Sequence, residues 1–259
     1  MTDESVEKNG CRATVNDLVA KGLLPASADE QVVRRETERV LKELSWRVTH
    51  DESASPTLET TSNPETREHV ISLTKDFNPL GLDDQLDYLH ELGHAWLGEH
   101  VNLLFATAYF HRDTPRALRF DQISESLRLA SDWFVENWEF RRIPKQMADS
   151  VRRDSDQLLR LARAGKLPPA GAHSLALQHA LLHLNVRPTL AVGSDGSMQR
   201  WVNAFLAILP NPPSASNLVL LTNRLLALWN SEYRVALSRE DGLPCDFLSV
   251  IDADNVGAS

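Results

Sequence analysis

The chain of 259 residues is 42% hydrophobic and carries a formal net charge of −9 at pH 7. This length provides for one large domain or two modest ones. No stretch approaches the roughly 18 apolar residues of a membrane span, and the acidic, polar start of the chain is unlike a signal peptide. Cys11 and Cys245 are too few for a disulfide framework. We therefore expect a cytoplasmic protein that does not enter the membrane.

Charge is distributed unevenly along the chain. Residues 1–150 carry 27 acidic against 17 basic side chains, whereas residues 151–259 carry 9 acidic against 10 basic ones. Phosphate binding requires a basic surface, so we do not expect the first 150 residues to bind nucleic acid directly. A basic protein or peptide partner is compatible with this charge.

The first third of the chain is predicted to contain a tail, a helix and two strands. Residues 1–13 have the composition of a disordered tail. Ser27 and Glu30 have the spacing of a capping box, and the helix that follows is expected to reach about Leu44. Two short stretches then predict strands, and a Ser-, Thr- and Pro-rich stretch between them predicts a loop. The strands cover 46–49 and 69–74, and the loop covers 52–65.

The rest of the chain is predicted to be helical. Apolar residues recur at helical spacing over 83–97, and the apolar segment 101–110 either continues this helix or packs beneath it. A second long helical pattern covers 116–140, and Pro144 is expected to close this unit. Further helices are predicted at 150–164, 173–184, 197–209 and 216–237, with linkers at 165–171 and 210–213.

The helix over 83–97 contains the run His90-Glu91-Leu92-Gly93-His94. Residues four apart share a helix face, so His90 and His94 can present two imidazoles to one metal ion. Glu91 follows the first histidine by about 100° of turn, near enough to hold a metal-bound water. This pattern is typical of a zinc peptidase, with two ligands and a carboxylate base. Gly93 lowers helix propensity, and a small residue here allows another backbone to pack closely.

A catalytic zinc ion of this type needs a third protein ligand, and the sequence leaves two routes to it. His100 follows the second histidine by six residues, as in metzincins, but Gly98 stands one position later than the glycine of that pattern. The other route is a carboxylate from the later helix. Its acidic residues at spacings of 4, 7 and 11 share one face: Asp121, Glu125, Asp132 and Glu136.

Geometry favours two of these acids. If the two helices form an antiparallel hairpin, the midpoint of the histidine pair maps to about residue 134, between Asp132 and Glu136. We predict that Asp132 is the ligand and that Glu136 orients a ligand histidine, with the exchange of these roles as the alternative. The mapping assumes that the first helix continues past Gly98.

The stretch from His69 to Pro144 resembles the ImmA/IrrE-type metallopeptidases, a gluzincin-like family. The resemblance rests on the strand HVISL, the helix HELGHAWLG and the run LASDWFVENWEFRRIP. The family usually has a glutamate just before the last run, whereas this chain has Arg128 and Ala130 there. The resemblance implies a zincin-like domain and a cytoplasmic, site-specific zinc endopeptidase. Members often cleave a helix-turn-helix repressor in stress response or phage defence.

Together these observations predict a mainly α (α+β) fold. A zincin-like domain with a small sheet covers 14–148, and an all-helical region of sensing or docking function covers 149–259. We expect a Zn²⁺-dependent endopeptidase with Glu91 as general base. The alternatives are a metzincin-like protease using His100 and a non-catalytic regulatory protein with a zinc fold. His179 and His183 repeat the four-residue spacing, but Ala180 stands where a base is needed, so we expect packed core histidines.

Overall fold

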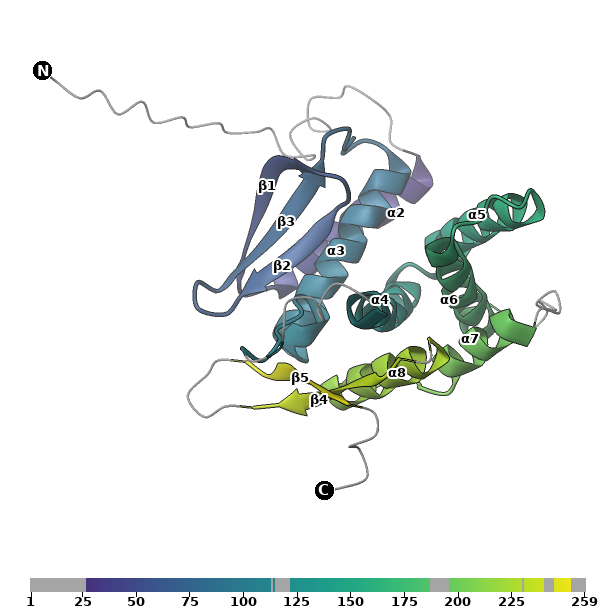
Figure 1. Ribbon diagram of the computed structural model, residues 1–259. Coiled ribbons are helices and arrows are strands. Elements are labelled where there is room, and N and C mark those ends of the chain that lie inside the picture. Colours follow the sequence, from purple (N-terminus) through teal and green to yellow (C-terminus); the bar gives the residue numbers. More distant parts are fainter. Residues whose placement is uncertain are drawn as a thin grey trace, which may run out of the picture.

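The computed structural model describes residues 27–112, 114, 122–186, 196–229, 231–239 and 245–252. The tail predicted for residues 1–13 lies outside these ranges. Seven α-helices and two small β-sheets make up the described part of the chain (Figure 1). The prediction of a mainly α fold with a small sheet is therefore confirmed.

The N-terminal part pairs one helix with a three-stranded sheet. Helix α2 (Ala28–Glu43) begins with the predicted capping box, in which Glu30 N–H donates to Ser27 Oγ at 3.2 Å and Ser27 N–H donates to a Glu30 carboxylate oxygen at 2.7 Å. Three strands follow in the spatial order β1-β3-β2, with β3 parallel to β1 and antiparallel to β2. They are β1 (Arg47–Ser55), β2 (Glu59–Asn63) and β3 (Glu68–Thr74).

The loop predicted over 52–65 is wrong, because β1 extends to Ser55 and β2 lies within this range. The buried face of β2 consists of two small hydroxyl residues whose hydrogen bonds are satisfied. Thr60 Oγ1 donates to the Glu91 carbonyl at 2.9 Å, and Ser62 Oγ lies 2.6 Å from His69 Nδ1. A polar strand of this kind lacks the apolar alternation on which strand prediction depends. In this sheet β3 is the central strand, and β2 is one of the two edge strands.

Helix α3 (Leu82–His100) carries the His-Glu-x-x-His run and packs against α4 (Gln122–Arg142). Gly93 makes their close approach possible, because a Cβ atom there would lie 2.7 Å from Val135 Cγ1. The helix ends at His100, and the next segment forms the short helix η1 (Leu103–Phe105). Of the two alternatives for 101–110, packing beneath the helix is the correct one, since the Phe105 carbonyl oxygen lies 2.7 Å from Nδ1 of His94 on α3.

Four more helices follow: α5 (Pro144–Arg163), α6 (Pro169–Asn185), α7 (Gly196–Leu206) and α8 (Ala215–Leu228). Pro144 begins α5 rather than closing the preceding unit, because a proline is well tolerated in the first turn of a helix. The domain boundary predicted at residues 148–149 therefore lies inside α5.

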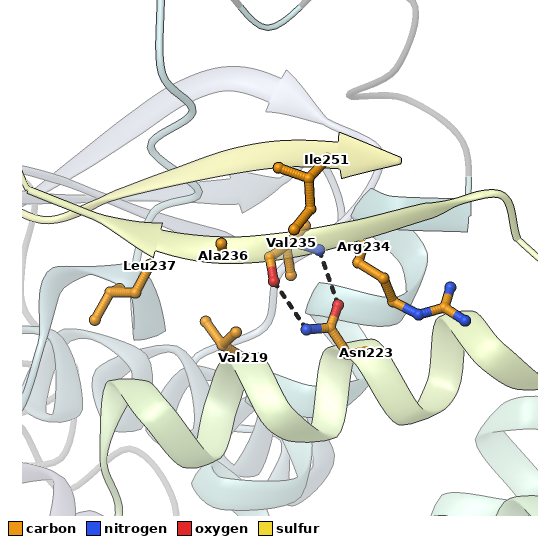
Figure 2. Close-up of a pocket in the computed structure, with 7 residues that line it drawn as sticks. All are labelled: Val219, Asn223, Arg234, Val235, Ala236, Leu237 and Ile251. Carbon is orange, nitrogen blue, oxygen red and sulfur yellow. Dashed lines mark hydrogen bonds between the residues drawn. The ribbon is translucent and has the colours of Figure 1, made fainter. Parts of the chain in front are cut away.

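The prediction of an all-helical C-terminal region is wrong. The helix expected over 216–237 ends at Leu228, and an antiparallel pair of strands follows, β4 (Tyr233–Ser238) and β5 (Phe247–Asp252). The Asn223 side chain on α8 hydrogen-bonds both the N–H and the carbonyl of Val235 at 2.8 Å, as a neighbouring strand would (Figure 2). This tertiary contact caps β4, and the sequence pattern gives no sign of it.

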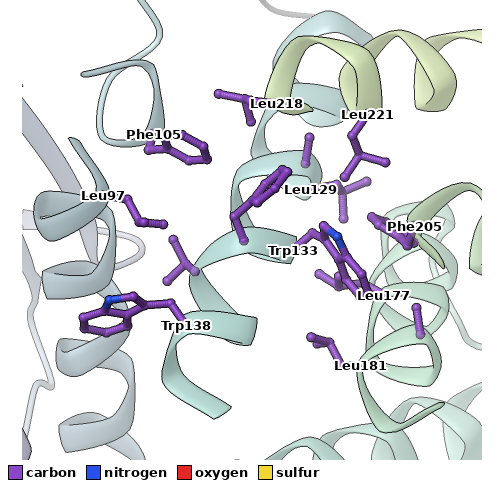
Figure 3. Packing of buried hydrophobic residues seen from close by; sticks show 14 of the residues in the cluster. Leu97, Phe105, Leu129, Trp133, Trp138, Leu177, Leu181, Phe205, Leu218 and Leu221 are labelled. Carbon is purple, nitrogen blue, oxygen red and sulfur yellow. The ribbon is translucent and has the colours of Figure 1, made fainter. Parts of the chain in front are cut away.

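Helix α4 runs through the hydrophobic core (Figure 3). On one side Trp138 and Leu97 lie between α4 and α3, and on the other Trp133 contacts Phe205 of α7 with ring centroids 5.7 Å apart. The Trp133 indole donates to the Ile208 carbonyl at 3.0 Å. No helix in the described ranges has both the length and the apolar character that crossing a membrane requires.

Candidate metal centre

His90 and His94 lie one turn apart on α3, and their Nε2 atoms are 3.1 Å from each other. The other ring nitrogen of each has a partner: His90 Nδ1 lies 3.1 Å from a Glu139 carboxylate oxygen, and His94 Nδ1 lies 2.7 Å from the Phe105 carbonyl oxygen. Because both partners accept hydrogen bonds, the protons belong on the Nδ1 atoms. Both Nε2 lone pairs are thereby free and directed toward the same point.

Asp132 on α4 completes a three-atom cluster with these nitrogens. Its Oδ1 lies 3.7 Å from His90 Nε2 and 3.5 Å from His94 Nε2. Its Oδ2 accepts a hydrogen bond from Arg128, one turn earlier on α4, at 2.8 Å. Burial would raise the pKa of Asp132, but its close contacts with the two histidines and the charge of Arg128 hold this pKa far below its usual range.

Two neighbouring groups have perturbed pKa values. Burial would lower the pKa of His90, but its hydrogen bonds with Asp132 and Glu139 raise this pKa well above the usual range. Burial raises the pKa of Glu136 to about 8, the positive charge of His90 opposes this rise, and the negative charges of Asp132 and Glu139 add to it.

Glu91 lies between the two histidines in sequence and is only 8% exposed. Its carbonyl accepts the Thr60 hydrogen bond from β2, which ties this turn of α3 to the sheet. One ligand atom from each of His90, Glu91 and His94 can be chosen so that all three lie within 4.8 Å of one another. This group of three side chains could therefore hold a metal ion.

The site opens into a cavity of about 360 Å³. His90 and Glu91 line this cavity together with Asp84 and Asp87 from the preceding turns of α3 and with the turn between β1 and β2. Desolvation in the cavity wall raises the pKa of Asp87 to about 6, against the opposing effect of His90 and with the help of nearby carboxylates. The cavity therefore combines the potential metal ligands with an acidic wall.

The structure brings some of the predicted site residues together and leaves others apart. Asp132 lies against both histidines, whereas none of the hydrogen bonds or ion pairs found at the site involves Glu136. Glu139, which sequence reasoning missed, makes the carboxylate contact expected of Glu136. A signal for it existed, because Glu139 follows Asp132 by seven residues and therefore shares its helix face.

The other predicted candidates are not at the centre. Helix α3 continues without a turn to His100, whose ring stacks on Trp96 at 4.3 Å and whose Nδ1 lies 2.9 Å from the Trp96 carbonyl oxygen. Six helical residues rotate by about 600°, so His100 faces away from His94. Glu125 reaches the site only through its ion pair with Arg128, at 3.0 Å. Asp121 lies outside the described residues.

No family model, curated protein or solved structure matches this chain. The conclusion about the site therefore comes from its own geometry: a partly buried His-Glu-His group on one helix, faced by an aspartate from a second helix, could hold a metal ion.

Proposed function

We propose that this protein is a zinc-dependent endopeptidase in which His90, His94 and Asp132 bind the metal ion and Glu91 is the general base. The observation that carries this proposal is the mutual spacing of three donor atoms, the two Nε2 atoms and Asp132 Oδ1, at 3.1, 3.5 and 3.7 Å. They come from two helices, so local helix geometry alone does not produce this cluster.

The spacing fits a zinc ion. Nitrogen and oxygen ligands lie about 2.0–2.2 Å from zinc, so two ligands in tetrahedral geometry are about 3.3–3.5 Å apart. The observed distances of 3.1–3.7 Å bracket this value. Three protein ligands leave one position open, which is the arrangement of a catalytic rather than a structural zinc site. Glu139 and the Phe105 carbonyl orient the two imidazoles from behind.

When bound, zinc supplies Lewis acidity, which makes water a nucleophile near neutral pH. Glu91 then takes a proton from the attacking water and delivers it to the leaving amine. Its position in the cavity wall, next in sequence to the ligand His90, suits this role. Arg128 holds Asp132 from the far side and keeps it ionised as a ligand.

The edge strand β2 offers a means of holding a peptide substrate. The backbone groups of Ser62 face away from β3, since its N–H donates to Thr107 Oγ1 at 2.7 Å and its carbonyl accepts the Tyr109 hydroxyl. Alternate residues of a strand point the same way, so Thr60 directs its N–H and carbonyl to the same side, nearer to Glu91. An extended peptide can add to this edge with its scissile bond toward the metal.

The finer parts of the proposal come from the resemblance to ImmA/IrrE-type peptidases. They are a zincin-like domain, a cytoplasmic location and a helix-turn-helix repressor as substrate. The metzincin-like alternative has less support, because His100 stacks on Trp96 and faces away from the histidine pair.

The decisive experiment compares zinc-loaded wild type with Glu91→Gln and with Glu65→Gln, an exposed residue of the β2–β3 turn. Each is incubated with a mixed peptide library and with small helix-turn-helix proteins, and new termini are identified by mass spectrometry. We expect specific cleavage by the wild type and by Glu65→Gln, and none by Glu91→Gln at unchanged zinc content. Identical product patterns from all three proteins would favour the non-catalytic alternative.

A further inference from the structure

We propose that the cavity beside Glu91 is a specificity pocket for a lysine or arginine side chain adjacent to the scissile bond, with Asp87 as the charge partner. This inference rests on the proposed function, because it names the substrate class of the same site. The proposed charge partner, Asp87, has no part in binding the metal ion.

The position of the cavity is the first argument. Its wall includes His90 and Glu91 on one side and Thr57 and Leu58, from the β1–β2 turn, on the other. A side chain that enters this cavity therefore belongs to a residue next to the bond being cleaved. The volume of about 360 Å³ lies at the lower end of the range for small-ligand sites and is sufficient for one long side chain.

The acidic residues around the cavity differ in whether they already have a hydrogen-bond or ion-pair partner. Asp83 pairs with Arg153 at 2.7 Å, and Asp84 accepts the Asn78 N–H at 2.9 Å. Both also lie in the first turn of α3, where an acid stabilises the helix dipole. Asp87 lies in the second turn, where this effect has fallen off. Within the described part of the chain, none of the hydrogen bonds or ion pairs that were found involves Asp87, and its side chain is accessible to solvent.

Glu91 provides a second, independent sign that a ligand enters here. It is more than nine-tenths buried, it lines the cavity, and its carboxylate accepts none of the hydrogen bonds found among the described residues. A largely buried residue whose carboxylate has no partner among the described residues is expected to meet water or a group that enters the cavity. The nearest cationic side chain on α4, Arg128, is already engaged by Glu125 and Asp132.

These features match the chemistry of a basic side chain. Lysine and arginine have a long apolar stem and a charged head, so the stem can pack against Leu58 while the head reaches Asp87. An acidic side chain meets repulsion in the same place. The cavity beneath β4 differs, because it is larger, about 580 Å³, is lined by Val219, Leu237 and Ile251, and contains no acid (Figure 2). Of these two cavities, the one at the candidate metal centre has the acidic lining that favours a positive charge.

The first test measures binding without catalysis. Zinc-loaded Glu91→Gln is titrated with blocked hexapeptides that differ only in a central arginine, norleucine or glutamate, by isothermal calorimetry. We expect the arginine peptide to bind about tenfold more tightly than the norleucine peptide, a preference that high salt weakens. Asp87→Asn in the same background should abolish this preference, and Asp76→Asn, an exposed acid outside the cavity, should retain it. Equal affinity for arginine and norleucine peptides would overturn the inference.

The second test uses wild-type activity on the mixed peptide library. We expect lysine or arginine next to the cleaved bond, and for Asp87→Asn an increase of about tenfold in KM for such substrates with little change in kcat. Cleavage that depends on Glu91 but shows no basic preference would overturn the pocket and leave the peptidase proposal intact. Absence of any Glu91-dependent cleavage would reject the peptidase proposal, and the binding titration would still decide whether the cavity selects a basic side chain.

Discussion

Two helices of this protein carry a pair of histidines at the same spacing, and their environments differ. On α3, His90 and His94 direct their Nε2 atoms to a common point, with acids and a carbonyl around them. On α6, His179 is buried, and neither of its ring nitrogens has a hydrogen-bond partner among the described residues, while His183 is exposed. The four-residue spacing therefore allows two histidines to bind the same metal ion, but the helix that faces them decides whether a metal site can form.

The physical reason lies in the helices that pack against each pair. Gly93 allows α4 to approach α3 so closely that Asp132 and Glu139 reach the two imidazoles. Helix α6 packs against α5, α7 and α4, but no acid contacts His179 among the described residues, and burial lowers the pKa of this histidine. A neutral histidine in such a position is a core residue whose ring nitrogens make no hydrogen bonds with the described residues. The comparison yields four predictions, from the largest expected effect to the smallest.

Removal of a metal-binding histidine should have the largest effect. His94→Ala should lose stoichiometric metal after dialysis, because two donor groups remain from a cluster of three. His179→Ala and His183→Ala should each retain one metal ion per chain. Metal content is measured by mass spectrometry of the gel-filtered protein, with circular dichroism as the control for folding. Metal loss from a folded His179→Ala protein would contradict the assignment to α3.

Replacement of Glu139, the acid that contacts His90, should have the next largest effect. Glu139→Gln should weaken zinc binding about 10–100-fold, because the carboxylate that fixes the His90 tautomer is lost. Glu136→Gln, three residues earlier on α4, is the matched control and should change the zinc affinity less than about threefold. Competition with a fluorescent chelator measures both affinities. A larger loss of zinc affinity in Glu136→Gln than in Glu139→Gln would instead identify Glu136 as the acid that orients His90.

The close approach of α3 and α4 can be tested with one methyl group. In Gly93→Ala the new Cβ meets Val135 Cγ1 at 2.7 Å and the Trp138 ring at 3.2 Å. We expect a loss of about 1–3 kcal/mol in the free energy of unfolding, more than the helix propensity gained. Gly196→Ala on α7 meets no atom within 4 Å and should be neutral or stabilising. Urea denaturation measures both, and Val135→Ala should partly rescue Gly93→Ala.

Replacement of His179 on α6 should have the smallest effect. Its effect on the free energy of unfolding should depend on pH. His179→Leu should raise the free energy of unfolding by about 1 kcal/mol, since it removes two buried nitrogens without partners. Burial lowers the pKa of His179, so below about pH 6.5 the unfolded chain binds a proton that the folded protein does not. The wild type therefore loses stability as the pH falls through this range, and His179→Leu should lose less.

The control for this prediction is His183→Gln, because His183 is exposed on the same helix. Its pH profile should follow that of the wild type. Parallel profiles for His179→Leu and wild type would show that the His179 ring has a partner, such as a buried water molecule.

Much of the local structure could be predicted from the sequence. The capping box at Ser27, the strand ending at Thr74 and the helix that carries His90 and His94 all follow from short-range patterns. Local chemistry dominates at such places, because the stabilising partners lie within a few residues. Strand β2 could not be predicted, because Thr60 and Ser62 are stabilised by hydrogen bonds to distant residues rather than by apolar burial.

At the candidate metal centre, too, some features follow from the sequence and others depend on the tertiary structure. The spacing of His90, Glu91 and His94 follows from the sequence alone, since 3.6 residues per turn place the two histidines on one face. The choice among the acids of α4 depends on the tertiary structure. One helical turn separates Glu136 from Glu139, so the crossing of α3 and α4 decides which carboxylate contacts His90. That crossing is set by the close packing of Gly93 against Val135, a contact between residues 42 positions apart.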